Sequence, residues 1–156
     1  MTTQVLNKSK IRKATMNHHD GTQRLVTVTD KETPFPKGHL LISHSDLSGN
    51  ITYVNRWLIH LSGYKESELV GKPHYILRHP DMPAAVFKEM WTTIQAGHIW
   101  QGPLKNLRKD SGFFWADMTV TPSTRRGKPI GYVSVYHELD RSEIEEYEER
   151  YAEDVV

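Results

Sequence analysis

Two segments with helical patterns are separated by Gly71-Lys72-Pro73-His74-Tyr75-Ile76-Leu77-Arg78-His79-Pro80-Asp81-Met82-Pro83. The prolines at positions 80 and 83 end any helix that enters from Gly71, and Pro83 can begin the next one. Because a residue before proline is pushed toward extended geometry, the segment from Arg78 to Met82 is predicted as an ordered, non-helical elbow. Such a polar elbow is costly to build for packing alone. We interpret it as a wall of a ligand site, the alternative being a surface loop with ordinary caps.

The residues before the elbow alternate between strand and helix patterns. Strands are predicted over 39–43 and 51–54, joined by a hairpin turn over 46–50. Asn55 is suited to cap the helix that follows, and a second short helix over 65–71 closes on a glycine. Several short helical pieces in succession argue against a plain sandwich or barrel.

The residues after the elbow begin with an amphipathic helix from Pro83 to Gly97. Its apolar residues recur at three- and four-residue steps, so this face is expected to be core. Trp91 lies on the same face, and it either packs in the core, which is the default, or faces a ligand.

Three strand signals complete the domain. They cover 100–107, 113–121 and 129–139, with turns over 108–112 and 122–127. Hairpins with local turns imply an antiparallel arrangement. The predicted fold is therefore α+β, with a five-stranded antiparallel sheet whose one face is covered by short helices and one longer helix.

The flanking segments are divided from the domain by composition. Residues 1–38 are polar and are interpreted as an N-terminal cap or leader with a short strand over 25–29. Residues 39–139 are interpreted as the domain. Residues 140–156 are rich in glutamate and are interpreted as the start of a linker helix. His18-His19 is a candidate metal pair, but without a second pair at suitable spacing a solvated pair is the expectation.

Composition narrows the function. The chain has 156 residues with 20 basic and 19 acidic side chains, a balance that gives no reason to expect a nucleic-acid partner. It has no cysteine, which excludes disulfides, thiolate catalysis and zinc–thiolate sites and is compatible with a cytosolic location. No apolar run is long enough to span a membrane. No nucleophile–base, phosphate-loop or paired-carboxylate pattern suggests an enzyme.

Four segments together resemble a PAS domain: Asn50-Ile51-Thr52-Tyr53-Val54-Asn55, Ser62-Gly63-Tyr64, Glu68-Leu69-Val70-Gly71-Lys72-Pro73 and Asn106-Leu107-Arg108-Lys109-Asp110-Ser111-Gly112-Phe113-Phe114-Trp115. Within that family, the elbow with Trp91, Trp100-Gln101-Gly102 and Lys105-Asn106 is similar to the N-terminal sensor of bacterial aerotaxis receptors. The resemblance implies noncovalent FAD binding and reporting of redox state or oxygen to the chemotaxis machinery. It also implies neighbouring signalling domains, a homodimer, and a longer chain anchored at the inner membrane.

The resemblance assigns cofactor contacts to particular residues. Asn106 matches an asparagine that holds the flavin edge in PAS relatives, and an inward amide on a strand can both donate and accept there; the alternative is that it satisfies neighbouring backbone. Trp91 and Trp100 match tryptophans near the flavin. Tyr136, on the last strand, is expected to face the pocket and to relay a change at the flavin, or else to be core.

The elbow supplies the polar candidates. Arg78 and His79 are expected at the pyrophosphate or the ring edge, because the arginine fork suits phosphate oxygens. Asp81 would repel phosphate, so we expect it to orient those two side chains. Asn55 is a weaker candidate at a helix start, which attracts anions but also needs a cap.

Two departures qualify the resemblance. Light-sensing PAS domains of the LOV type carry a cysteine where this chain has His74, so an adduct-forming photocycle is excluded. Their second flavin-edge asparagine matches Ala116. Two alternatives to the flavin sensor remain: a haem-binding gas sensor with His74 or His79 as axial ligand, and a cofactor-free interaction domain.

Overall fold

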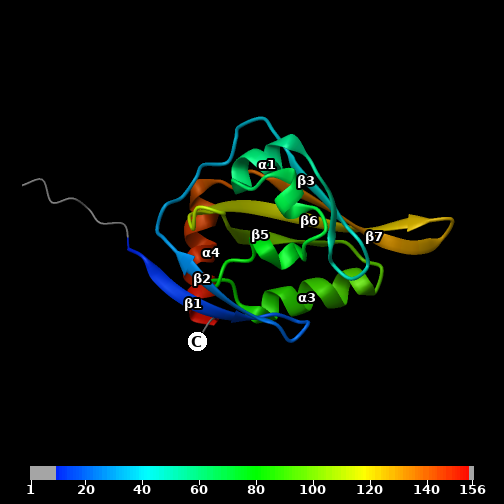
Figure 1. The fold of residues 1–156 in the computed structure, drawn as a ribbon, viewed down its shortest axis with the longest axis horizontal. Helices are drawn as coiled ribbons and strands as arrows, with labels where there is room; N and C mark the ends of the chain where they lie inside the picture. The colour runs from blue at the N-terminus through cyan, green and yellow to red at the C-terminus, as the bar shows by residue number, and fades with distance from the viewer. Residues whose placement is uncertain (1–9, 155–156) are drawn as a thin grey trace, which may run out of the picture.

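The sheet is the centre of the computed structural model, which describes residues 10–154 (Figure 1). Its strand order is β4-β3-β7-β6-β5, and every pairing is antiparallel. The predicted five-stranded antiparallel sheet is therefore confirmed. Its strands are β3 (Leu41–Ser45), β4 (Ile51–Val54), β5 (Trp100–Leu107), β6 (Phe113–Arg125) and β7 (Lys128–His137).

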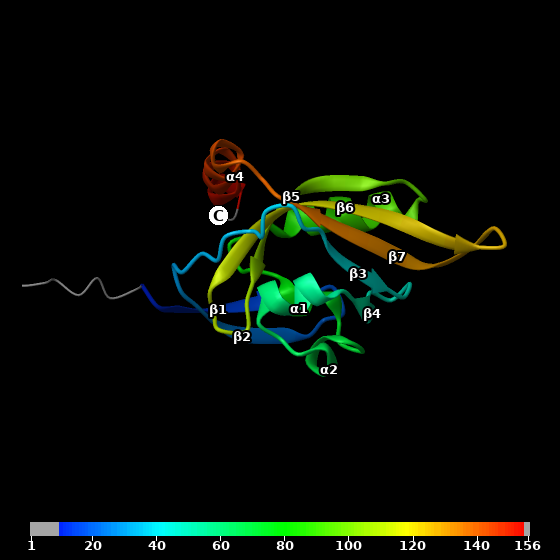
Figure 2. The same ribbon diagram turned by 90° about the horizontal axis from the view of Figure 1, so that it is seen from above.

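Short helices connect β4 to the long helix and cover one face of the sheet. They are α1 (Arg56–Ser62), α2 (Glu66–Leu69) and the 3-10 helix η1 (His74–Leu77), followed by α3 (Ala84–Gln95). Asn55 caps α1, since its side chain accepts a hydrogen bond from the Leu58 backbone N–H. The final helix, α4 (Arg141–Asp154), lies on the opposite side of the sheet from α1 and α2 (Figure 2).

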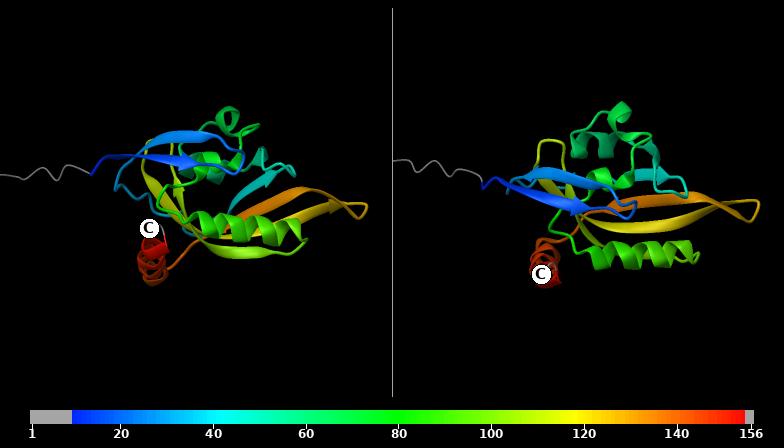
Figure 3. Two further views of the ribbon diagram at one scale, coloured as in Figure 1. Left: turned by 90° about the horizontal axis from the view of Figure 1, so that it is seen from below. Right: turned by 60° about the horizontal axis from the view of Figure 1, so that its bottom comes forward.

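A hairpin precedes the sheet and packs against it. Its strands β1 (Arg12–Asn17) and β2 (Gln23–Val28) form a separate two-stranded sheet on the side of α1 and α2 (Figures 2 and 3). Met16, Val26 and Val28 are buried together with Leu107 of β5. The polar leader expected from the sequence thus contains a docked hairpin, and only its second strand was predicted.

The ends of three strands of the sheet differ from the sequence-based predictions. β3 covers 41–45 rather than 39–43, and β7 covers 128–137 rather than 129–139. β6 continues through Pro122, which was predicted to begin a turn. β5 starts opposite Val120, so β6 beyond this point pairs only with β7. A strand with one free edge tolerates proline, because the missing N–H is not needed on that side.

The turn between β6 and β7 is shorter than predicted. Arg126 and Gly127 both have positive φ, and the partners Arg125 and Lys128 close the turn as in a two-residue type I′ hairpin. The resulting hairpin projects beyond the rest of the molecule (Figures 1 and 3). No helix among residues 10–154 is long and apolar enough to cross a membrane.

Gly131 of β7 lets the backbone at the end of β3 approach β7 closely. A Cβ atom at this position would lie 2.0 Å from the backbone oxygen of Ser45. We therefore expect Gly131→Ala to lower the free energy of unfolding by about 3 kcal/mol in a denaturant titration, since rigid backbone must move. The control is Gly127→Ala, where nothing lies within 4 Å and the cost is about 1 kcal/mol for positive φ alone. Equal losses in the two variants would contradict this account.

Candidate functional site

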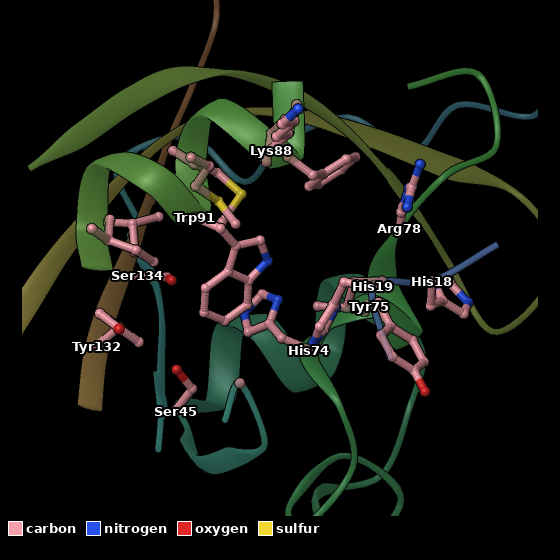
Figure 4. Close-up of a pocket in the computed structure, with 18 of the residues that line it drawn as sticks. His18, His19, Ser45, His74, Tyr75, Arg78, Lys88, Trp91, Tyr132 and Ser134 are labelled. Atoms are coloured by element: carbon pink, nitrogen blue, oxygen red, sulfur yellow. The ribbon is translucent and has the colours of Figure 1, made fainter. Parts of the chain in front are cut away.

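A cavity of about 760 Å³ lies between the sheet, α3, η1 and the turn of the β1–β2 hairpin. Ligand sites for small molecules typically enclose about 300–1,000 Å³, so the volume is that of a cofactor or metabolite site. Figure 4 shows Trp91 and His74 near its middle, His18 and Tyr75 at one end, and Tyr132 and Ser134 at the other.

The walls of the cavity are mostly apolar. One wall is α3, whose apolar face packs against the core as expected and also borders the cavity, with most of its side chains only half-buried. The opposite wall is the inner face of the sheet. The apolar lining consists of Phe87, Met90, Trp91 and Ile94 from α3 and Leu104, Met118, Val120 and Tyr132 from the sheet. Two opposed apolar walls form a slot suited to a flat ring system.

His74 lines the cavity and connects it to the sheet. Its Nε2 lies 2.9 Å from Ser43 Oγ and 3.0 Å from Tyr136 Oη, and the two oxygens are 3.4 Å apart. Burial lowers the pKa of His74 to about 4 and raises the pKa of Tyr136. The imidazole is therefore neutral near pH 7, and its hydrogen bonds link the cavity to β3 and β7.

Arg78 follows η1 and also lines the cavity. Its backbone forms an isolated bridge with Asn106, so the elbow runs beside β5. Its guanidinium lies 4.5 Å from the centre of the Phe87 ring, and Nη1 donates to the Asn17 carbonyl at 3.4 Å. The buried Nε has no hydrogen-bond partner. Burial lowers the pKa of Arg78, but an arginine stays charged at neutral pH.

The turn of the β1–β2 hairpin closes one end of the cavity. The His18 ring stacks on Tyr75, with centroids 3.7 Å apart and planes 4° from parallel. The Tyr75 hydroxyl donates to Asp20 Oδ2 at 2.9 Å. Hydrogen bonds from Thr22 are the main cause that lowers the pKa of Asp20 to about 2, so this carboxylate is ionised. The His19 ring lies between the rings of Tyr75 and Trp91, and its centroid is 5.4 Å from that of the Trp91 ring.

An ion cluster behind the cavity holds the elbow in place. Asp81 Oδ2 accepts a hydrogen bond from Lys105 Nζ at 2.9 Å, and Arg12 of β1 pairs with the same carboxylate. His79 is buried, and its Nδ1 accepts from the Asp81 backbone N–H at 3.0 Å. Burial, with the charge of Lys105, lowers the pKa of His79 to about 3. Burial alone would raise the pKa of Asp81, but its hydrogen bond to Lys105 helps to lower it.

The family to which this fold belongs follows from comparison with known proteins. The family model described as the PAS fold matches residues 40–139.

The chain belongs to the PAS family.

Two relatives of this PAS domain are by name a receptor and a regulatory protein. It is 40% identical to the aerotaxis receptor of Escherichia coli (strain K12) over 124 residues, which cover 80% of this chain and 24% of the receptor. It is 30% identical to the nitrogen fixation regulatory protein of Klebsiella pneumoniae over 90 residues, covering 58% of this chain and 18% of that protein. The chain thus spans about a quarter or less of the length of these relatives.

Solved structures share the fold. The blue-light photoreceptor Aureochrome1 LOV in its light state superposes with a TM-score of 0.60 at 22% identity, covering 73% of this chain and 88% of that one. A PAS domain from Colwellia psychrerythraea gives a TM-score of 0.59 at 22% identity, covering 64% and 86%. These likenesses and the family match confirm the predicted PAS fold.

The predicted cofactor residues fall into two groups. Those that line the cavity are Arg78, Trp91 and Asn106. Asn106 is buried on β5, and its amide Nδ2 donates to the Leu104 carbonyl at 3.2 Å. Trp91 reaches across the cavity to Tyr132, and its ring also limits the space beside Gly49.

The remaining predicted residues do not border the cavity. They are Asn55, His79, Asp81, Trp100 and Tyr136. Besides capping α1, the Asn55 amide donates to the Leu40 carbonyl, and its oxygen accepts from the Ile42 N–H. The buried Trp100 ring lies against Gly102.

Sequence reasoning missed the contribution of the hairpin turn and of Tyr75 to the cavity. The run His18-His19-Asp20-Gly21 between two alternating segments would have indicated a hairpin. Nothing local indicated where that hairpin docks. No group of three or more histidine, aspartate or glutamate side chains within residues 10–154 is arranged to hold a metal ion.

The half-buried His74 should make the PAS domain sensitive to acid. Its pKa of about 4 in the fold is below the 6.5 of an unfolded chain, so the unfolded chain binds more protons between these values. The stability that neutral His74 maintains is present above pH 6.5, is lost as pH falls toward 4, and changes no further below that. At about 1.4 kcal/mol per pKa unit, the loss is about 3 kcal/mol.

This prediction is checked by denaturant titrations of wild type and His74→Gln at pH 7 and pH 4. The stability of wild type should fall by about 3 kcal/mol more than that of the variant. His44→Gln, at an exposed site outside the cavity, is the matched control and should follow wild type. Parallel losses in all three proteins would show that the fold does not lower the pKa of His74.

Proposed function

We propose that this PAS domain binds FAD noncovalently in the cavity and reports the redox state of the flavin, and through it oxygen, to a chemotaxis-type output. The observation that carries the proposal is the slot between α3 and the sheet, which is apolar on both walls and has a few polar groups at its ends. Flavin sites need this combination of flat apolar walls and sparse polar groups. The 40% identity to the E. coli aerotaxis receptor supports the same reading.

The chain offers suitable groups for each part of the cofactor. Trp91 and Met90 supply apolar contact to a ring system, and Asn106 offers an amide at the sheet side. Arg78 has a buried Nε without a partner, so a polar ligand group would satisfy it. When bound, FAD would supply reversible uptake of electrons and protons. The role proposed for the protein is therefore sensing rather than catalysis.

His74 and Tyr136 are the groups through which a change in the cavity would reach the sheet. His74 borders the cavity, and Tyr136 lies behind it, fully buried on the central strand β7. Ser43 of β3 contacts both His74 and Tyr136. A rearrangement of hydrogen bonds at His74 must therefore also change the contact between the Ser43 and Tyr136 hydroxyls, which joins β3 to β7. Tyr136 thus acts on the output through His74 rather than by lining the cavity.

The partners follow from the family resemblance. We propose that the domain signals to neighbouring domains of the same receptor, functions as a homodimer, and lies in the cytoplasm, with membrane anchoring left to other segments. α4, which follows β7 and stacks Tyr151 on Trp115 of the sheet, is the connection proposed for the output.

The cofactor proposal is tested by the visible spectrum of the purified protein, with mass analysis of the compound that heat releases. We expect two flavin bands and release of FAD. A Soret band would replace the proposal by a haem sensor, and a protein that stays colourless after incubation with FAD would replace it by a cofactor-free interaction domain. Either result overturns FAD binding.

Trp91 provides a test of where the flavin binds. We expect Trp91→Ala to weaken FAD binding by roughly 10- to 100-fold, because an aromatic contact of about 1.5–3 kcal/mol is lost. Affinity is measured by fluorescence titration of the apoprotein. Trp57→Ala is the control, since this half-buried tryptophan stacks on His39 outside the cavity. A Trp91→Ala variant that binds FAD as tightly as the control would exclude this cavity.

Tyr136→Phe tests the relay. The hydroxyl group is lost while the ring still fills its buried site, so we expect FAD affinity to change less than about threefold. We expect the flavin spectrum or the oxygen response to change, because His74 loses a partner at 3.0 Å. The response is measured in swimming cells carrying an E. coli aerotaxis receptor whose matching segment is replaced by this domain. If both properties match wild type, Tyr136 is only a core residue.

A further inference from the structure

His18 follows strand β1 at the hairpin turn, and its burial there is unusual for a polar side chain. Its side chain is buried, with 6% of the residue exposed, and it borders the cavity. Neither ring nitrogen has a hydrogen-bond partner in the protein. Burying an unsatisfied polar atom costs about 1–3 kcal/mol, so such a group in a cavity wall points to a ligand that completes it.

Arg78 also lines the cavity and also lacks a hydrogen-bond partner for a buried nitrogen. Its Nε is also buried without a partner, and none of the ion pairs found within residues 10–154 includes this guanidinium. Phosphate oxygens accept hydrogen bonds from an arginine that has no carboxylate partner and from the single N–H of a neutral imidazole. Figure 4 places both side chains at the same end of the cavity, away from Tyr132 and Ser134.

The charges at the cavity favour an anion. Its lining contains Arg78, Lys88 and Lys105 against the carboxylate of Asp20. Lys105 is neutralised by Asp81. Asp20 is held by hydrogen bonds from Thr22 and Tyr75, which spread its charge over the hairpin turn. Two cations therefore remain against one carboxylate.

We propose that His18 and Arg78 form a phosphate subsite, in which the N-terminal hairpin contributes directly to binding the phosphate groups of the flavin nucleotide. This inference rests on the proposed FAD function and adds to it a ligand contact from outside the segment that the PAS family model matches, residues 40–139. The stack of His18 on Tyr75 fixes the orientation of the imidazole. Arg24, which donates to the Ile76 carbonyl at 3.0 Å, fixes the hairpin against η1.

The subsite predicts discrimination among flavins by their phosphates. Riboflavin, FMN and FAD share the ring, and riboflavin alone has no phosphate. His18→Phe keeps an aromatic ring on Tyr75 and removes both nitrogens. We expect this variant to bind FAD and FMN at least 10-fold more weakly than wild type and riboflavin within about twofold, as measured by fluorescence titration of the apoprotein. His98→Phe, at an exposed site outside the cavity, should bind all three as wild type does.

Arg78→Met gives an independent measurement at the same subsite and serves if a change at position 18 unfolds the hairpin. It too should weaken FAD and FMN while sparing riboflavin. Equal weakening of all three flavins in both variants, or no weakening of FAD in either, would overturn the subsite. Failure of wild type to bind any of the three flavins would instead overturn the proposed function.

Discussion

The partly buried ion pair between Asp81 and Lys105 is the interaction on which the site depends. It joins the elbow to β5 at the point where Met82 is buried and its sulfur accepts a hydrogen bond from the Lys105 backbone N–H. η1 ends on one side of this attachment and α3 begins on the other. Because both ends are fixed, the two helices enclose a space that the sheet cannot fill. Removing Asp81 would leave the buried Lys105 ammonium without its partner, whereas Asp81 is partly exposed and is also paired with Arg12.

The space above the sheet is a cavity because large side chains are absent from part of the inner face. Ser134 of β7 is a small residue in the lining of the cavity, where a bulkier side chain would occupy part of the space. Protein interiors are otherwise packed as densely as organic crystals, so a void of this size forfeits many contacts. The half-buried aromatic and methionine side chains of α3 are the ones that lose them. A flat ligand would restore those contacts, which is the physical basis for treating this void as a binding site.

The sequence was informative where local rules decide the structure. β4 and β5 were predicted with their observed bounds, and the elbow with its flanking helices followed from prolines and caps. The end of β6 was predicted wrongly because a proline at position 122 is tolerated only where no strand pairs with that edge of β6. β1 was missed because its burial arises from Leu107, which is remote in the chain. Of the residues that the resemblance assigned to the cofactor, Arg78, Trp91 and Asn106 line the cavity. His18 was not among them, because its place in the cavity wall depends on contact with the remote Tyr75.

The docked hairpin also bears on the order in which the molecule assembles. Its contacts join residues that are 52 to 82 positions apart, from Arg24 to Ile76 and from Thr29 to Ser111. Contacts with such separation form late, since the loop between them must close first. During synthesis the hairpin leaves the ribosome well before the surface that receives it has been made. The hairpin can therefore close its end of the cavity only after η1 and β5, the elements that receive it, have been made.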